Sequence, residues 1–197
     1  MKNFFSIILV SILIWSCSTS DQPNDAITSK IEDVNIEEKI QDLLGKMTLK
    51  EKAGQMLNIG LPTILTGDYW DARENAVFDA ERFKKYIIDL NVGSIHNTPG
   101  YLADNKEWYR IVKTIQDSAI QKSRLGIPVL YGIDNIHGAN YVAGSVMFPH
   151  QIAMAATWNP ELTEISAKIT SYESKSASLP WNFNPNADVA MSPLWGR

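Results

Sequence analysis

Asp134 is the residue whose type and position most directly suggest chemistry. It follows the apolar run PVLYGI, for which we expect a buried strand, so its carboxylate would lie at the carboxyl end of that strand. Parallel α/β folds place their ligand-binding side chains at such ends. A carboxylate there can accept hydrogen bonds from two adjacent sugar hydroxyls, or it can cap the next turn beside Asn135 or His137. Spacing alone leaves both interpretations open.

The three histidines are candidates for a metal site. His96, His137 and His150 lie in three separate strand–helix units, and neither a His-x-x-x-His spacing nor a Cys/His spacing links them. Histidines without such spacing more often have a structural role. We therefore expect no metal and no other cofactor.

Tryptophans are a further group, because their rings can stack on sugars. Isolated aromatic side chains more often belong to a core than to a binding platform. We therefore apply the core interpretation to Trp158 and Trp181, and keep only Trp195, which lies close to Arg197, as a candidate. The sequence has no Gly-x-Ser-x-Gly, P-loop or dinucleotide motif, so it gives no support to triad hydrolase, nucleotide or redox chemistry.

The elements that would position these residues alternate between apolar strands and amphipathic helices. Thr48 and Glu51 predict a capping box, and Asn159 followed by Pro160 predicts another helix start. We expect strands near residues 54–61, 91–100, 128–135 and 181–189, and helices over 36–47 and from 48, 79, 105 and 159.

About four such strand–helix units predict an α/β fold with a parallel sheet. A closed eight-stranded barrel needs about 250 residues, so this chain suffices for the first half of a (β/α)8 TIM-type barrel. An open, flavodoxin-like sheet would also fit the length. It is disfavoured because no Gly-rich, phosphate-binding turn follows the first strand.

Composition places the chain among globular proteins. Of its 197 residues, 45% are hydrophobic and 20% are charged, and the formal net charge is −4. Its lysines and arginines are scattered among acidic residues, whereas nucleic-acid binding needs them clustered. We therefore expect no nucleic-acid partner.

The N-terminus has the pattern of an export signal. A basic start precedes the apolar run FFSIILVSILIW, which is shorter than the roughly 20 residues that span a bilayer. The run ends in ILIWSC, which resembles the bacterial lipobox, with Cys17 as the lipidated residue. An ordinary cleaved signal with an incidental cysteine is the alternative. We assign residues 1–17 to a lipoprotein signal with its lipidated cysteine, and residues 18–35 to a flexible tether.

Several longer motifs then occur in order. They are LLGKMTLKEKAGQM, GIPVLYGIDNIHGAN, VMFPHQIAMAATWNPEL and WNFNPNADVAMSPLWGR. Together they resemble successive segments of the N-terminal barrel of glycoside hydrolase family 3, over nearly all of residues 36–197. The resemblance implies an incomplete (β/α)8 barrel in this segment.

The same resemblance implies a function. It implies a β-glucosidase-like retaining hydrolase of terminal non-reducing β-D-glucosyl residues, which acts on glucosides or β-linked oligosaccharides in carbohydrate catabolism. Asp134 and Arg197 match residues that hold the terminal sugar, whereas the nucleophile and the acid/base are expected beyond residue 197. Asp188 matches an acid that supports a strand end by packing and hydrogen bonding. The resulting expectation is an exported bacterial lipoprotein, held in the periplasm or outer membrane by lipid at Cys17.

Two other functions stay open. The first is a surface lipoprotein that binds glycans without cleaving them, and the second is a β-N-acetylhexosaminidase of the same family. We expect residues 1–197 alone to be catalytically inactive, because retaining hydrolysis needs two carboxyl groups on opposite sides of the bond. We also expect this segment to be poorly soluble, because half a barrel leaves two strand edges uncovered.

Overall fold

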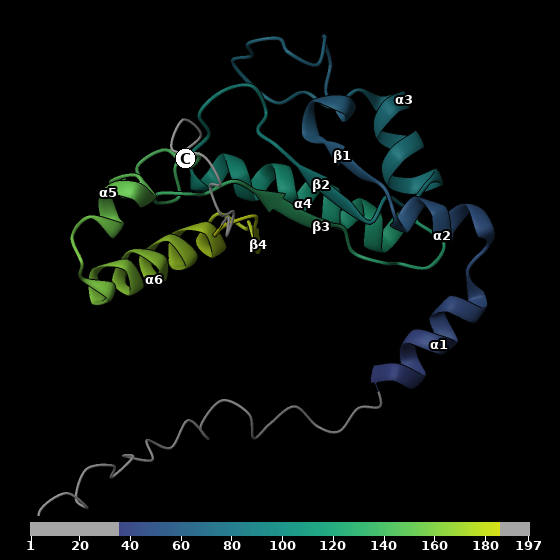
Figure 1. Cartoon of the computed structure of the whole chain (residues 1–197). Coiled ribbons are helices and arrows are strands. Elements are labelled where there is room, and N and C mark those ends of the chain that lie inside the picture. Colours follow the sequence, from purple (N-terminus) through teal and green to yellow (C-terminus); the bar gives the residue numbers. More distant parts are fainter. Residues whose placement is uncertain (1–35, 186–197) are drawn as a thin grey trace, which may run out of the picture. The chain divides into compact units, whose positions relative to one another are not determined.

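A computed structural model describes residues 36–185 and shows one parallel sheet of four strands. Its order is β1-β2-β3-β4, so each strand pairs with the next one in the sequence (Figure 1). The strands are β1 (Asn58–Gly60), β2 (Ser94–His96), β3 (Leu130–Ile133) and β4 (Trp181–Asn182). A flavodoxin-like sheet would have the order 2-1-3-4. The observed sequential order is that of a barrel, and the prediction of parallel strands alternating with helices is confirmed.

Register in the sheet aligns the strand ends. Gly60 pairs with His96, and His96 pairs with Gly132. In the last pair of strands, Ile133 lies opposite Asn182. The residues that follow β1, β2 and β3 therefore emerge at one edge of the sheet, where parallel α/β folds bind ligands.

The chain divides after Ile40 into two units. In the first unit the structure describes residues 36–40, which begin helix α1 (Ile36–Lys46). The predicted helix over 36–47 is confirmed to within one residue, but none of its side chains is buried. All elements from α2 onward belong to the second unit.

Two helices of the second unit begin at the caps that the sequence predicts. Helix α2 (Leu49–Gln55) has the capping box of Thr48 and Glu51, and α6 (Pro160–Ser176) has Asn159 as its cap, whose side chain accepts from the Leu162 N–H. Helix α4 (Asn105–Lys122) begins after Asp104, whose carboxylate accepts from the Glu107 N–H. The short helix α5 (Gln151–Ala155) precedes α6.

The core lies between the sheet and α4, which runs alongside β2 and β3 in Figure 1. Helix α4 buries one stripe of side chains at helical spacing: Trp108, Ile111, Val112, Ile115, Ser118 and Ala119. From the sheet, Ile95, Tyr131 and Ile133 belong to the same buried cluster. Ile120, which follows Ala119 on the same helix, is 51% exposed.

The segment that follows Asp79 differs from a simple amphipathic helix. It starts as α3 (Ala80–Phe83) and continues as a π-helical stretch, η2 (Lys84–Asp89). The wider turn is closed by a bond from the Leu90 N–H to the Lys85 carbonyl. It buries Ile87 fully in the core. A hydrophobic pattern with the 3.6-residue period of an α-helix does not predict the wider turn of a π-helix.

No helix within residues 36–185 is long and apolar enough to cross a membrane. The last strand is also shorter than expected, because β4 contains only two residues of the predicted 181–189. Residues 186–189 of that prediction lie outside the described part of the chain.

Candidate functional site

Asp134 lies where the sequence predicts it, directly after β3 and exposed at the carboxyl edge of the sheet. The other predicted site and anchor residues, Cys17 and Arg197, lie outside the described residues. Asp188 and Trp195 lie there as well. Of the two predicted substrate-binding residues, Asp134 is therefore the one that lies within the described part of the chain.

The backbone after Asp134 is held by the side chain of Asn182. The Asn135 N–H donates to Oδ1 of Asn182 over 3.0 Å, and Nδ2 of Asn182 donates to the Asn135 carbonyl over 2.9 Å. Asn135 is fully buried, and its own Nδ2 donates to Ser174 Oγ on α6 over 2.7 Å. Asp134 thus stands between a paired strand and a clamped residue, so its backbone is held in place before any ligand binds.

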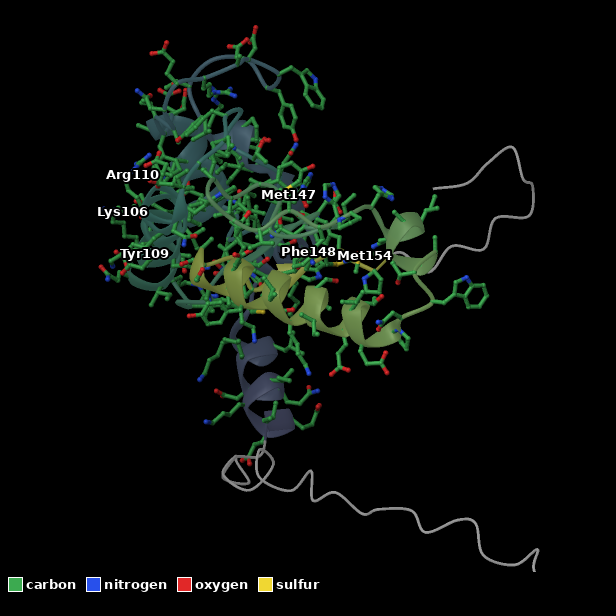
Figure 2. All side chains as sticks on the ribbon, turned by 90° about the vertical axis from the view of Figure 1, so that its left-hand side faces the viewer. Lys106, Tyr109, Arg110, Met147, Phe148 and Met154 are labelled. Atoms are coloured by element: carbon green, nitrogen blue, oxygen red, sulfur yellow. The ribbon has the colours of Figure 1, made fainter. Side chains whose placement is uncertain are left out.

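The rest of this loop is held by similar contacts. The Ile136 N–H donates to Oδ1 of Asn140, and the Phe148 N–H donates to the His137 carbonyl; Figure 2 labels Phe148. Gly138 adopts a φ of +103°, and a Cβ at this position would lie 2.0 Å from the Val146 carbonyl oxygen. Asn135, Gly138 and Asn140 of the NIHGAN sequence after Asp134 therefore each have a role in the geometry of this loop.

The structure brings two of the three histidines together. The His137 and His150 rings lie 5.8 Å apart between centroids, although the sequence places them in separate units. His96 is elsewhere, with Nδ1 2.9 Å from Oδ1 of Asn58. Within residues 36–185, no three His, Cys, Asp or Glu side chains are grouped as metal ligands would be.

The core interpretation is wrong for Trp158, which is 93% exposed between α5 and α6. Trp181 is partly buried and packs edge-on against Phe183. Sequence reasoning missed Tyr69 and Trp70, which lie in the loop after β1, with Trp70 86% exposed. The signal that could have found them is a pair of adjacent aromatic residues within the polar sequence TGDYWDARE.

The turn after β2 lies at the same edge. Asn97 has a φ of +75°, and its carbonyl accepts a hydrogen bond of 2.7 Å from Tyr131 Oη. Burial raises the pKa of the Tyr131 hydroxyl well above its usual range, so this group remains a donor at neutral pH. A buried residue of β3 thereby fixes the turn that follows β2.

Known proteins resemble this chain in sequence. The chain is 35% identical over 166 residues to the lysosomal beta glucosidase of Dictyostelium discoideum, covering 80% of this chain and 20% of that protein. It is 28% identical over 158 residues to the periplasmic beta-glucosidase of Salmonella typhimurium, covering 80% of this chain and 17% of that protein. The chain thus spans a fifth or less of the length of these relatives.

Among solved structures, the exo-1,3/1,4-beta-glucanase of a Pseudoalteromonas species superposes with a TM-score of 0.66 at 27% identity. The match covers 84% of this chain and 19% of that one. It confirms the predicted fold class, because the four parallel strands and their helices match part of a family barrel. Residues 48–197 match the model of the glycosyl hydrolase family 3 N-terminal domain, and the chain therefore belongs to this family.

Proposed function

We propose that this chain is the substrate-binding front part of an exported, retaining β-glucosidase. Family membership and the two relatives named as beta-glucosidases support this choice of substrate. The activity belongs to the whole protein, of which we infer that this chain supplies the first strands of the barrel. Two carboxyl groups outside it would act as nucleophile and acid/base, as a retaining mechanism requires.

The observation that carries the proposal is the setting of Asp134. Its carboxylate is exposed at the edge of the sheet, whereas the backbone on both sides is held by β3 and by Asn182. A carboxylate on a fixed backbone can accept hydrogen bonds from two neighbouring hydroxyls of a pyranose. Asp134 is not needed to cap the next turn, because Asn182 and Asn140 already accept from the N–H groups of Asn135 and Ile136.

In this proposal Arg197 is the second sugar-binding residue. A guanidinium group donates several hydrogen bonds in one plane, so it complements a carboxylate that only accepts them. Together the two groups would bind the terminal non-reducing ring and leave its glycosidic bond for the carboxyl groups outside this chain.

Kinetics of the full-length protein test the role of Asp134. Asp134→Asn preserves the size of the side chain but removes its charge and one acceptor, so kcat/KM for an aryl β-D-glucoside should fall by roughly 100-fold or more. Asp117→Asn is the matched control, because it removes an exposed carboxylate that pairs with Lys113 on α4. Unchanged kinetics in Asp134→Asn would contradict the proposed role.

A substrate panel tests the choice of sugar. Aryl β-D-glucosides, β-D-xylosides and N-acetyl-β-D-glucosaminides should be compared, with the glucoside expected to give the highest kcat/KM. Proton NMR should show the β-anomer as first product, because a retaining mechanism preserves configuration. Preference for the glucosaminide would favour the hexosaminidase alternative, and binding without turnover would favour a glycan-binding protein.

We further propose that lipid at Cys17 anchors the protein. The position of this cysteine at the end of a short apolar run supports the proposal. In cells fed a labelled fatty acid, the wild-type protein should carry label and sediment with membranes. Cys17→Ala should lose both properties, and sedimentation without label in the wild type would contradict acylation.

A further inference from the structure

Gln151 is the first residue of α5, and its side chain contacts two segments that follow different strands. Its Nε2 donates to Oδ1 of Asn184, which lies just beyond β4. The same nitrogen lies 3.5 Å from the carbonyl oxygen of Ile136, in the loop after β3. Because β3 and β4 are paired, one amide nitrogen joins the chain that leaves two neighbouring strands.

The two partners determine which way this amide points. A backbone carbonyl only accepts hydrogen bonds, so the Ile136 carbonyl requires the NH2 group of Gln151. That group has two hydrogens, and each is directed to a different segment. Asn184 presents its oxygen, because a second NH2 group could not accept from the first. The link therefore has one polarity, with Gln151 as donor to both sides.

Helix α5 provides a fixed base for Gln151. The Met154 N–H donates to the His150 carbonyl at the start of the helix, and Figure 2 labels Met154. Just before the helix, the Phe148 N–H donates to the His137 carbonyl. The backbone that leads into Gln151 is therefore attached to the same loop that its side chain contacts.

The link through Gln151 is the second tie between these segments. In the first, the Asn182 side chain pairs with the backbone of Asn135. The second tie lies one residue further along the loop after β3, at Ile136, and beyond β4 at Asn184. A single attachment lets one segment rotate about the other, whereas two successive attachments fix their relative position.

The two linked segments are the ones that carry the predicted sugar-binding residues. Asp134 lies in the same loop as Ile136, and Arg197 lies further along the chain that leaves Asn184. Two groups that bind one sugar ring must keep their spacing, because a binding site tolerates displacements of only about 0.5 Å. A tie between the segments is therefore placed where it can control sugar affinity.

We propose that Gln151 is a positioning residue that sets the spacing between the Asp134 loop and the segment that leads to Arg197. The inference rests on the proposed function, because it takes both sugar-binding residues from it. Gln151 itself contacts no sugar in this proposal. It acts through the two segments, so its loss weakens binding of the terminal ring in a protein that still folds.

Two isosteric substitutions in the full-length protein test the polarity of the link. Gln151→Glu places a carboxylate against the Ile136 carbonyl, so one acceptor faces another. The inhibition constant of glucose, measured against an aryl β-D-glucoside, should rise by roughly tenfold. Asn184→Asp keeps an oxygen that accepts from Gln151, so the constant should stay within about twofold of wild type.

Two further variants test the same link by removing it. Gln151→Ala deletes the donor, and Asn184→Leu deletes the acceptor at nearly constant size, so both should raise the inhibition constant. Asn184→Leu keeps the test decisive if Gln151→Ala does not fold. In an Asp134→Asn background, Gln151→Ala should raise the constant less than it does in wild type, because both changes act on one binding site.

Gln116→Glu is the matched control. The Gln116 amide on α4 also clamps a strand, because it bonds both the N–H and the carbonyl of Val129. Val129 precedes β3, at the opposite end from Asp134. This variant should lower the unfolding midpoint and leave the inhibition constant of glucose unchanged. A purely structural role for Gln151 would give the same result in Gln151→Glu.

The outcomes separate this inference from the proposed function. Wild-type inhibition constants in the Gln151 variants, with normal turnover in the wild type, would overturn the role of Gln151 alone. Equal rises in Gln151→Glu and Asn184→Asp would also overturn it, because the polarity of the link would then not matter. If the wild type neither cleaves nor binds a β-glucoside, the proposed function fails, and the role of Gln151 in sugar binding fails with it.

Discussion

The two loops that flank the candidate site are held in different ways. The loop after β3, which follows Asp134, is held by neutral amide side chains around the buried Asn135. The loop after β1, which carries Trp70, is held at its exposed surface by arginines that donate to backbone carbonyls. Buried amides have no water to replace a lost partner, whereas surface carbonyls do.

This difference separates the roles of the two loops. A defect in the loop after β3 should damage folding and terminal-sugar binding together. A defect in the loop after β1 should change local order and lower the free energy of unfolding by about 1 kcal/mol or less. Substitutions of equivalent residues in the two loops test this contrast.

The largest effect is expected from one pair of glycines. Gly138 and Gly67 both have a positive φ, of +103° and +81°. A Cβ at Gly138 would meet the Val146 backbone oxygen at 2.0 Å, whereas a Cβ at Gly67 would meet Oδ2 of Asp71 at 2.6 Å, a side-chain atom that can rotate away by giving up its bond from the Asp68 N–H. Gly138→Ala should therefore lower the free energy of unfolding by about 3 kcal/mol, and Gly67→Ala by about 1 kcal/mol.

Urea unfolding followed by tryptophan fluorescence measures both glycine variants. Equal losses in the free energy of unfolding would contradict the proposed difference between the two loops. They would mean that the left-handed backbone conformation alone determines the cost in each loop.

Asn182→Ala should give the next largest effect. It leaves the N–H and the carbonyl of the buried Asn135 without their partner, at a cost of about 2 kcal/mol. Asn182→Asp keeps the acceptor for the N–H but loses the donor, so it should fall between Ala and wild type near neutral pH. Unfolding midpoints measure the order of stability. A fully stable Asn182→Ala would show that water replaces the amide.

Arg73→Ala is expected to act locally. The global free energy of unfolding should fall by no more than about 1 kcal/mol, since the three carbonyls gain water. Amide hydrogen exchange should accelerate by roughly tenfold over residues 66–77 and stay unchanged over 134–140. Arg73→Lys should resemble alanine, because an ammonium group cannot span three carbonyls as a planar guanidinium does. Faster exchange in both segments would contradict the view that the two loops are stabilised independently of each other.

Much of this arrangement could be predicted from the sequence. The caps at Thr48 and Asn159 depend on short-range spacing, and the parallel strands depend on apolar runs, so both were accessible without coordinates. Asp134 was found for the same reason, since a strand end can be read from the residues that precede it.

The long-range contacts that hold these residues in place could not be predicted from the sequence. Asn182 reaches Asn135 across 47 positions, and Tyr131 on β3 reaches the carbonyl of Asn97, which follows β2. Such partners depend on how strands pair, which no local pattern encodes. Trp158 was predicted wrongly for a different reason. Tryptophan is usually buried, and this general tendency does not hold for Trp158, which lies in an exposed turn.

The smallest expected effect concerns the attachment of the loop after β1 to α4, where Nη2 of Arg110 donates to the Ala76 carbonyl. Hydrogen bonds from Arg110 hold the pKa of Glu107 at about 2, below its ordinary value of 4.5. A lowered carboxyl pKa stabilises the fold above pH 4.5, and this contribution disappears as the pH falls through about 2. Glu107→Gln should therefore lower the free energy of unfolding by about 1 kcal/mol or less at pH 7 and by nearly nothing at pH 2. Urea titrations across this range measure the difference, with Asp117→Asn as the exposed-pair control; a gap that persists at pH 2 would show that Glu107 acts by packing.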